Sequence, residues 1–88
     1  MENYKYAASE GQKLILNFIK NRMIDKGVTE TEICKVIGIT QIELSSYFTN
    51  KTSLPLFIYL QILGMLELRP YIVAKEEDDT IMNRTFFN

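Results

Sequence analysis

The feature that most restricts the fold lies in residues 28–55, where two helix starts follow each other closely. Thr29 is followed three residues later by Glu32, and Thr40 is followed three residues later by Glu43. This spacing is that of a capping box, in which the Thr oxygen accepts from a backbone amide and the Glu carboxylate accepts from the amide of the Thr. The pattern therefore predicts two short helices that begin directly after these threonines.

A glycine separates the two predicted helices. Gly38 stands where the first helix must stop and where the backbone needs a positive φ. We expect helices over about 30–37 and about 41–49, joined by a tight turn. Two short helices about a glycine turn are an arrangement with which proteins place one helix in a DNA groove while the other braces it.

Apolar residues at three- and four-residue intervals predict a longer helix before this pair. We expect it to begin at about Ala7 or Ser9 and to run to Lys26, with Gly27 at its end. Its expected apolar stripe is formed by Leu14, Ile15, Phe18, Ile19, Met23 and Ile24. The two short helices are expected to bury Ile33, Cys34, Ile37, Leu44 and either Tyr47 or Phe48.

A fourth helix is predicted after the loop at residues 50–53. Ser53 supplies the expected N-cap, Pro55 fits the first turn, and the helix should end near Leu68, before Pro70. This segment is apolar on most sides, as expected for a central core helix or for a contact between subunits.

The pattern changes after the predicted helices, and residues 70–88 form an extension of the helical domain at residues 1–69. Residues 71–74 are apolar and partly β-branched, which predicts a strand, and residues 80–87 can form a second one. An isolated hairpin is marginal in water, so we expect these strands to pair with their copies in a homodimer. A loosely packed tail is the alternative.

Composition limits the chemistry that the chain can carry. Its 88 residues, of which 47% are hydrophobic, are enough for one folded domain. The single cysteine and the lack of histidine exclude a disulfide within one chain and leave neither a usual Cys/His zinc site nor a histidine general base. We expect no enzyme, metal or cofactor. With no leader-like start and no apolar run long enough for a bilayer, we expect a cytoplasmic protein without membrane contact.

The net charge of −1 is less basic than is usual for a protein that binds nucleic acid. Four of the acidic residues, however, form one run at residues 76–79. The residues before that run carry 9 basic and 7 acidic side chains. A slightly basic body with an acidic tail is compatible with DNA binding without arguing for it.

With flanking helices, residues 12–68 resemble the lambda-repressor-like family, the Xre or Cro type of helix-turn-helix DNA-binding domain. The matching residues are Glu32-Ile33-Cys34 for the family's Glu-Leu-Ala, Gly38 in the turn, Thr40-Gln41 at the start of the recognition helix, Thr49-Asn50-Lys51 for Asn-Gly-Lys, and Pro55. The resemblance implies a mainly α, compact domain of four to five helices, to which the predicted C-terminal strand or hairpin is added.

The chain departs from the family pattern in three ways. Glu30 replaces a Gln that often touches phosphate, and a carboxylate there repels phosphate. Met23 and Phe48 occupy the places of a buried Arg–Glu pair, which a hydrophobic pair can replace without loss of stability. Glu43 lies on the recognition helix, where it can either serve the cap or accept from a cytosine amino group.

Together with the resemblance, these patterns predict that double-stranded DNA is bound by the third helix and the loop after it. The expected DNA-binding residues are Thr40, Gln41, Ile42, Glu43, Ser45, Ser46, Asn50 and Lys51. Gln41 suits adenine, Ile42 suits a thymine methyl group, and the loop residues can donate to phosphate. The simpler interpretation is that these are exposed polar residues, one exposed isoleucine and a loop whose Ser53 caps the next helix.

The expected function is sequence-specific DNA binding by a transcriptional regulator of bacterial or phage type that acts as a homodimer. The alternative is a protein-interaction module that keeps the helix-turn-helix fold without binding DNA. Glu30 and the acidic character of the two short helices favour that alternative. Cys34 is expected to be a small buried thiol at a helix crossing, because no histidine is available to activate it.

Overall fold

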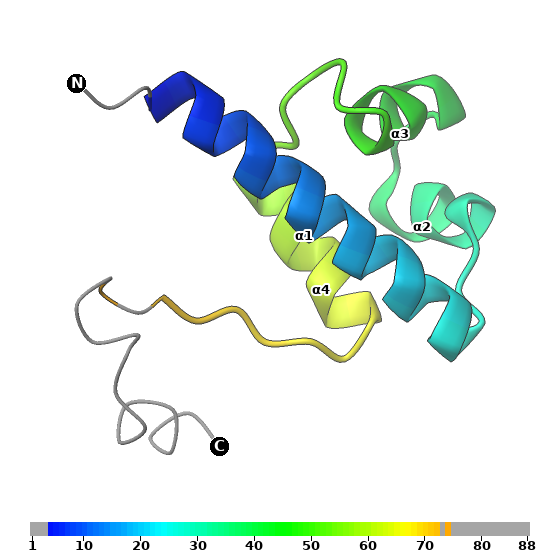
Figure 1. Ribbon diagram of the computed structural model, residues 1–88. Helices are drawn as coiled ribbons and strands as arrows, with labels where there is room; N and C mark the ends of the chain where they lie inside the picture. The colour runs from blue at the N-terminus through cyan, green and yellow to red at the C-terminus, as the bar shows by residue number, and fades with distance from the viewer. Residues whose placement is uncertain (1–3, 73, 75–88) are drawn as a thin grey trace.

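The computed structural model describes residues 4–72 and 74, and this part of the chain is mainly α, as predicted (Figure 1). It contains four helices, α1 (Tyr4–Lys26), α2 (Glu30–Ile37), α3 (Gln41–Phe48) and α4 (Leu56–Met65). Within the same residues no helix combines the length and the apolar character that a membrane crossing requires.

The predicted helix boundaries are correct for the two short helices and less accurate for the long ones. α2 has the predicted bounds, and α3 ends at Phe48, one residue early. α1 is helical from Tyr4, the first described residue, and so extends further toward the N-terminus than predicted. α4 ends at Met65, where the chain turns through Glu67 at a φ of 57°. A non-glycine residue in this left-handed region cannot continue an α-helix.

The predicted cap of the fourth helix is wrong. Pro55, not Ser53, is the N-cap of α4, and no side chain caps that helix. The φ of −62° and ψ of 141° at Pro55 are the extended values that a residue adopts just before a helix. Its carbonyl accepts from the amide of Tyr59 at 2.9 Å, so the ring that fixes φ also begins the helical hydrogen bonding.

The core is formed by ten buried residues that come from all four helices and the turn after α4. They are Leu16, Ile19, Met23, Ile33, Cys34, Leu44, Phe48, Ile62, Leu63 and Leu66. Ile33 and Cys34 are buried as predicted, and Phe48 rather than Tyr47 is the fully buried aromatic residue of α3. Met23 and Phe48 both belong to this apolar core.

The apolar stripe predicted for α1 is only partly buried. Ile19 and Met23 are in the core, but Leu14, Phe18 and Ile24 are 71%, 61% and 77% exposed. The periodic pattern identified a helix whose apolar residues cover more than one side. Only the side that carries Leu16, Ile19 and Met23 packs on the body of the domain, so α1 keeps an apolar surface.

α1 and α4 run in the same direction, and α2 packs on α3 and on α4. Near their carboxyl ends, Arg22 Nε donates to the carbonyl of Leu66 at 3.0 Å, and Lys26 forms an ion pair with Glu67. The hydrogen bond and the charge of Lys26 lower the pKa of the Glu67 carboxyl group. In Figure 1, α2 and α3 lie together on one side of the α1–α4 pair.

The predicted C-terminal strands are not found in the described residues. Tyr71, Ile72 and Ala74 have no strand structure. The second predicted strand at residues 80–87 and the acidic run at 76–79 lie outside the residues that the structure describes. The predicted pairing of these strands between subunits therefore stays a prediction.

Candidate nucleic-acid interface

Both predicted capping boxes are present. Thr29 Oγ1 accepts from the amide of Glu32 at 3.2 Å, and Glu32 Oε1 accepts from the amide of Thr29 at 3.1 Å. At the start of α3, Thr40 Oγ1 accepts from the amide of Glu43 at 3.0 Å, and Glu43 Oε1 accepts from the amide of Thr40 at 2.9 Å. These reciprocal bonds fix the first residue of each short helix and hold two carboxylates at the positive ends of helix dipoles.

Gly38 makes the predicted turn between α2 and α3. Its φ is 85° and its ψ is 36°, in the left-handed region. The amides of Gly38 and Ile39 both donate to the carbonyl of Cys34, at 2.8 Å and 3.2 Å. This closed turn sets the direction in which α3 leaves α2, and so determines which side of α3 faces away from the core.

The exposed side of α3 carries most of the residues predicted to read DNA bases. Leu44 is fully buried and Phe48 is 4% exposed, so these two residues anchor one side of the helix. Thr40, Gln41, Ile42, Glu43 and Ser45 are exposed, and we call these five residues the α3 surface. Ile42 is 79% exposed, although it is a large apolar side chain. Burial in the core accounts for the apolar side chains of Leu44 and Phe48. It does not account for the isoleucine at position 42, which lies outside the core.

Gln41 is held beside α2. Its Nε2 donates to Thr31 Oγ1 at 3.1 Å, and both residues are exposed. Breaking a hydrogen bond between exposed groups costs little, because water or another partner can replace it. Gln41 is therefore placed at the outer edge of the helix pair, with an amide that can change partners.

Glu43 is used by the cap in this structure. The sequence allows Glu43 either to serve the cap or to contact a cytosine. In the structure its carboxylate accepts from the backbone amide of Thr40, as the cap requires. Thr40 is engaged in the same box, so the side chains of these two residues fix the start of α3. Both residues are exposed.

Residues at the end of α3 are less exposed than expected for DNA-contacting residues. Ser46 is half-buried, and its carbonyl accepts from the amides of Lys51 and Thr52 at 2.9 Å and 3.2 Å. The carbonyl of Ser45 accepts from the hydroxyl of Thr49 at 2.8 Å. The residues after α3 are thus folded back on the end of the helix.

Asn50 anchors this loop to α1. It is half-buried with a φ of 64°, and its Oδ1 accepts from Gln12 Nε2. The sequence interpretation missed Gln12, although a signal was present. Gln12 precedes Leu16, Ile19 and Met23 at the same three- and four-residue spacing, so a polar group stands at a core-facing position of α1. Such a group needs a partner, and Asn50 supplies it.

Two lysines of α1 lie near the end of α3, and the sequence interpretation did not include them. Lys13, Asn17 and Lys20 line a hollow of about 330 Å³ together with Leu16, Phe48, Thr49 and Asn50. Lys20 Nζ lies 5.9 Å from the centroid of the Phe48 ring. Lys13 forms an ion pair of 3.0 Å with Glu10. With the exposed Lys51, these side chains place positive charge beside the loop after α3.

Cys34 is the buried thiol that the sequence predicts. It is 9% exposed, and burial raises its pKa, as do the nearby carboxylates of Glu30 and Glu43 to a smaller extent. A raised pKa keeps the sulfur protonated, which lowers its reactivity. Within residues 4–72 and 74, no group of His, Cys, Asp and Glu side chains is arranged to hold a metal ion.

The structure brings six of the eight predicted residues to an exposed position, namely Thr40, Gln41, Ile42, Glu43, Ser45 and Lys51, and leaves Ser46 and Asn50 half-buried. Comparison of the chain with family models, curated proteins and solved structures finds no match. Function is therefore inferred from the surface of α2 and α3 and from the residues that carry the resemblance.

Proposed function

We propose that this protein binds double-stranded DNA in a sequence-specific manner through α3, braced by α2, and acts as a homodimeric transcriptional regulator of bacterial or phage type in the cytoplasm. The observation that supports this proposal is the division of α3 into two sides. One side is anchored by the buried Leu44 and Phe48, whereas the other presents polar residues and the 79% exposed Ile42. An apolar side chain among hydrogen-bonding ones is the combination that base edges in a major groove require.

The proposed readout follows from the chemistry of the α3 surface. The major groove of B-DNA is about 12 Å wide and admits an α-helix. Gln41 donates to and accepts from the edge of an adenine, and Ile42 packs on a thymine methyl group. In a two-fold dimer, the two α3 helices contact half-sites about 34 Å apart, one turn of the duplex.

The charges near α3 are compatible with this role. The carboxylates of Glu32 and Glu43 accept from backbone amides at helix starts, where the helix dipole offsets part of their charge. Lys51 follows α3, and Lys13 and Lys20 lie beside its end. In the proposed complex these lysines face the phosphate backbone, where they position the protein without reading sequence.

The alternative function is a protein-interaction module on the same helix pair. Glu30 favours it, because an exposed carboxylate at the start of α2 repels a nearby phosphate. A binding titration on mixed-sequence DNA over a series of salt concentrations separates the two functions. Affinity that rises as salt falls supports DNA binding, whereas no binding at low salt supports the interaction module.

Replacing Gln41 with Ala is expected to remove the preference for the best DNA site and to leave folding intact. A good bidentate contact discriminates against the wrong base by about 1–3 kcal/mol, which corresponds to roughly 5- to 150-fold in affinity. The measurement is fluorescence anisotropy on a site selected from random sequence and on single-base variants of that site.

Thr31→Ala is the matched control for this experiment. It removes the hydrogen bond between Thr31 and Gln41 but leaves the Gln41 amide in place. It should therefore keep the site preference that Gln41→Ala loses. Equal affinities of the Gln41→Ala variant and the original protein across the whole panel would exclude Gln41 from base recognition.

Replacing Lys51 with Ala is expected to weaken binding to all DNA sequences alike. The loss of one phosphate contact should reduce the slope of log K against log salt concentration by about 0.9. Lys5→Ala is the control, because Lys5 is an exposed cation in the first turn of α1 that does not line the hollow beside α3. An unchanged slope in the Lys51 variant would remove this lysine from the interface.

A further inference from the structure

α1 and α4 carry large apolar side chains that the described residues leave exposed. Six of them are between 41% and 74% exposed, and we group them as the α1–α4 face: Leu14, Ile15, Phe18, Leu56, Phe57 and Leu60. Ile15, Phe18 and Leu56 among them line hollows between the two helices. The exposed area of the six is on the order of 600 Å², if each side chain offers up to about 200 Å². This is as large as the largest apolar patch of a typical monomer, which is often functional.

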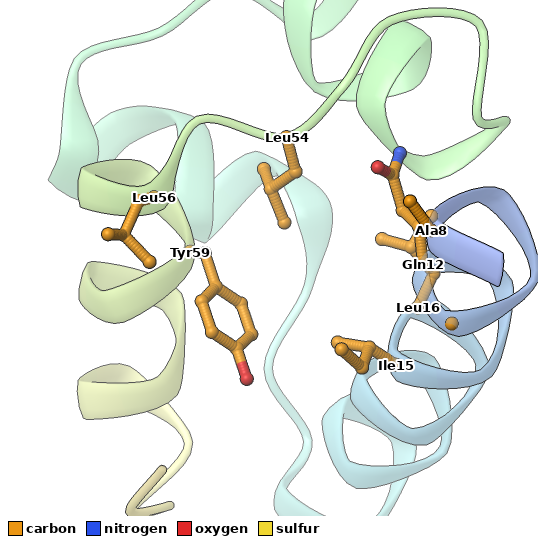
Figure 2. A pocket seen from close by; sticks show the side chains of 8 residues that line it. Ala8, Gln12, Ile15, Leu16, Leu54, Leu56 and Tyr59 are labelled. Carbon is orange, nitrogen blue, oxygen red and sulfur yellow. The ribbon is translucent and has the colours of Figure 1, made fainter. Parts of the chain in front are cut away.

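The α1–α4 face has a groove as well as projecting side chains. Figure 2 shows Tyr59 of α4 and Ile15 of α1 on opposite walls, with Leu54 between the two helices. The hollow there has a volume of about 330 Å³. A second hollow of about 180 Å³ is also lined by Ile15 and Tyr59 and extends past Phe18 to the exposed Arg69 at one end. The two hollows therefore form one groove along α1 and α4.

Charged side chains are absent from this face over most of its length. All ten residues of α4 are uncharged. On α1, Tyr4, Ala8, Gly11, Ile15 and Phe18 follow one another at spacings of four and three residues, without a charged residue among them. Such a stripe is the pattern of a helix seam that packs against another helix. Apart from Arg69 at one end of the groove, this surface offers no charge with which DNA or a strongly charged protein could pair.

We propose that a second copy of this chain covers the α1–α4 face and forms a two-fold dimer. This proposal locates the interface of the homodimer in the proposed function. It rests on that homodimer and not on DNA binding. A two-fold axis places the same patch of both copies in contact. The six apolar side chains of the patch meet their copies without like-charge repulsion, because the one charged residue of the groove, Arg69, lies at its end. The exposed Leu56, Phe57 and Leu60 can then pack on the partner's groove. The exposed apolar area also approaches the roughly 800 Å² per partner that a stable interface buries.

The proposed dimer leaves the DNA-reading residues accessible. α2 and α3 lie together on one side of the α1–α4 pair in Figure 1, and none of the residues that line the groove belongs to α2 or α3. Two copies joined by their α1–α4 faces therefore carry their α3 surfaces outside the interface.

The test is sedimentation velocity of the full chain over a concentration series, without DNA. The original protein is expected to be a dimer that dissociates on dilution, and Phe57→Glu is expected to raise the dissociation constant at least 100-fold. The substitution puts two unpaired charges into an apolar interface, one from each copy. Because Phe57 is 74% exposed, the helical content by circular dichroism should not change.

Ile24→Glu is the matched control. Ile24 is 77% exposed on α1 but lines a different hollow, with Met23, Gly27 and Val28. Dimers that persist in Ile24→Glu and are lost in Phe57→Glu support the proposal. A monomeric original protein, or a dimer unaffected by Phe57→Glu, overturns it. If the original protein is monomeric and Phe57→Glu lowers its melting temperature, the face is covered within one chain. DNA binding by a monomer would overturn this interface and the proposed homodimer but not the proposed DNA binding. A dimer without DNA binding would overturn only the DNA proposal.

Discussion

Replacing Leu44 with Ala is expected to lower the free energy of unfolding by about 2–5 kcal/mol. Leu44 is fully buried and is one of only two buried residues of α3, so its truncation leaves a cavity where that helix is anchored. A domain of this size has a total stability of roughly 4–13 kcal/mol. The variant should therefore unfold at a clearly lower denaturant concentration than the original protein. The measurement is denaturant unfolding followed by far-UV circular dichroism.

Ile42→Ala is the control for that experiment, because it makes a similar truncation two residues earlier on the same helix. Ile42 is 79% exposed, so its truncation should change the free energy of unfolding by no more than about 0.5 kcal/mol. In the proposed function it should weaken binding to sites that contain the contacted thymine. If the two variants lost the same stability, the division of α3 into an anchored side and an exposed side would be wrong.

The parts of the fold that the sequence predicted well are those controlled by neighbouring residues. Thr29 and Glu32, like Thr40 and Glu43, form their hydrogen bonds across three positions, so the residue types alone locate the helix starts. Gly38 makes the turn because its own backbone adopts a positive φ, so this residue too is recognised without knowledge of distant contacts. For this reason α2 has its predicted bounds, and the turn lies where it was expected.

The less accurate predictions concern contacts between segments that are distant in sequence. The periodic pattern identified the apolar residues of α1, but it did not show which side of the helix packs on the body of the domain. Phe18 was therefore placed in the buried stripe, whereas it is exposed. The bond between Gln12 and Asn50 joins residues 38 positions apart, so no local pattern revealed that Asn50 holds the loop. Pro55 begins α4 because its ring sets φ, which made a side-chain cap from Ser53 unnecessary.

The same limit applies to the candidate site. Capping explains why Glu43 lies at the start of α3, and the three- and four-residue spacing predicts that Leu44 is buried. Whether a third-helix residue is accessible depends on the packing of the whole domain. Ser46 is half-buried because the chain after α3 folds back on its carbonyl. The sequence thus placed most of the candidate residues on one exposed side of α3 and overestimated how far that side extends.

Replacing Gly38 with Ala is expected to lower the free energy of unfolding by about 1–2 kcal/mol. Its φ of 85° lies in the left-handed region, which an alanine adopts only with strain. A Cβ atom at this position would meet nothing within 4 Å, so no steric clash contributes to the loss of stability. The loss comes only from the strain of the backbone conformation. The measurement is denaturant unfolding in the Phe57→Glu background, where the proposed self-association cannot affect the result.

Gly64→Ala is the control that isolates this backbone effect. Gly64 lies in α4 with ordinary helical geometry, and a Cβ atom there would also meet nothing within 4 Å. The same substitution should therefore stabilise the protein by about 0.5–1 kcal/mol, because alanine is the better helix former. Opposite signs for one chemical change would show that Gly38 is required for its backbone conformation. If Gly38→Ala did not change the free energy of unfolding, the turn between α2 and α3 would adopt another geometry in solution. The direction in which α3 projects would then differ as well.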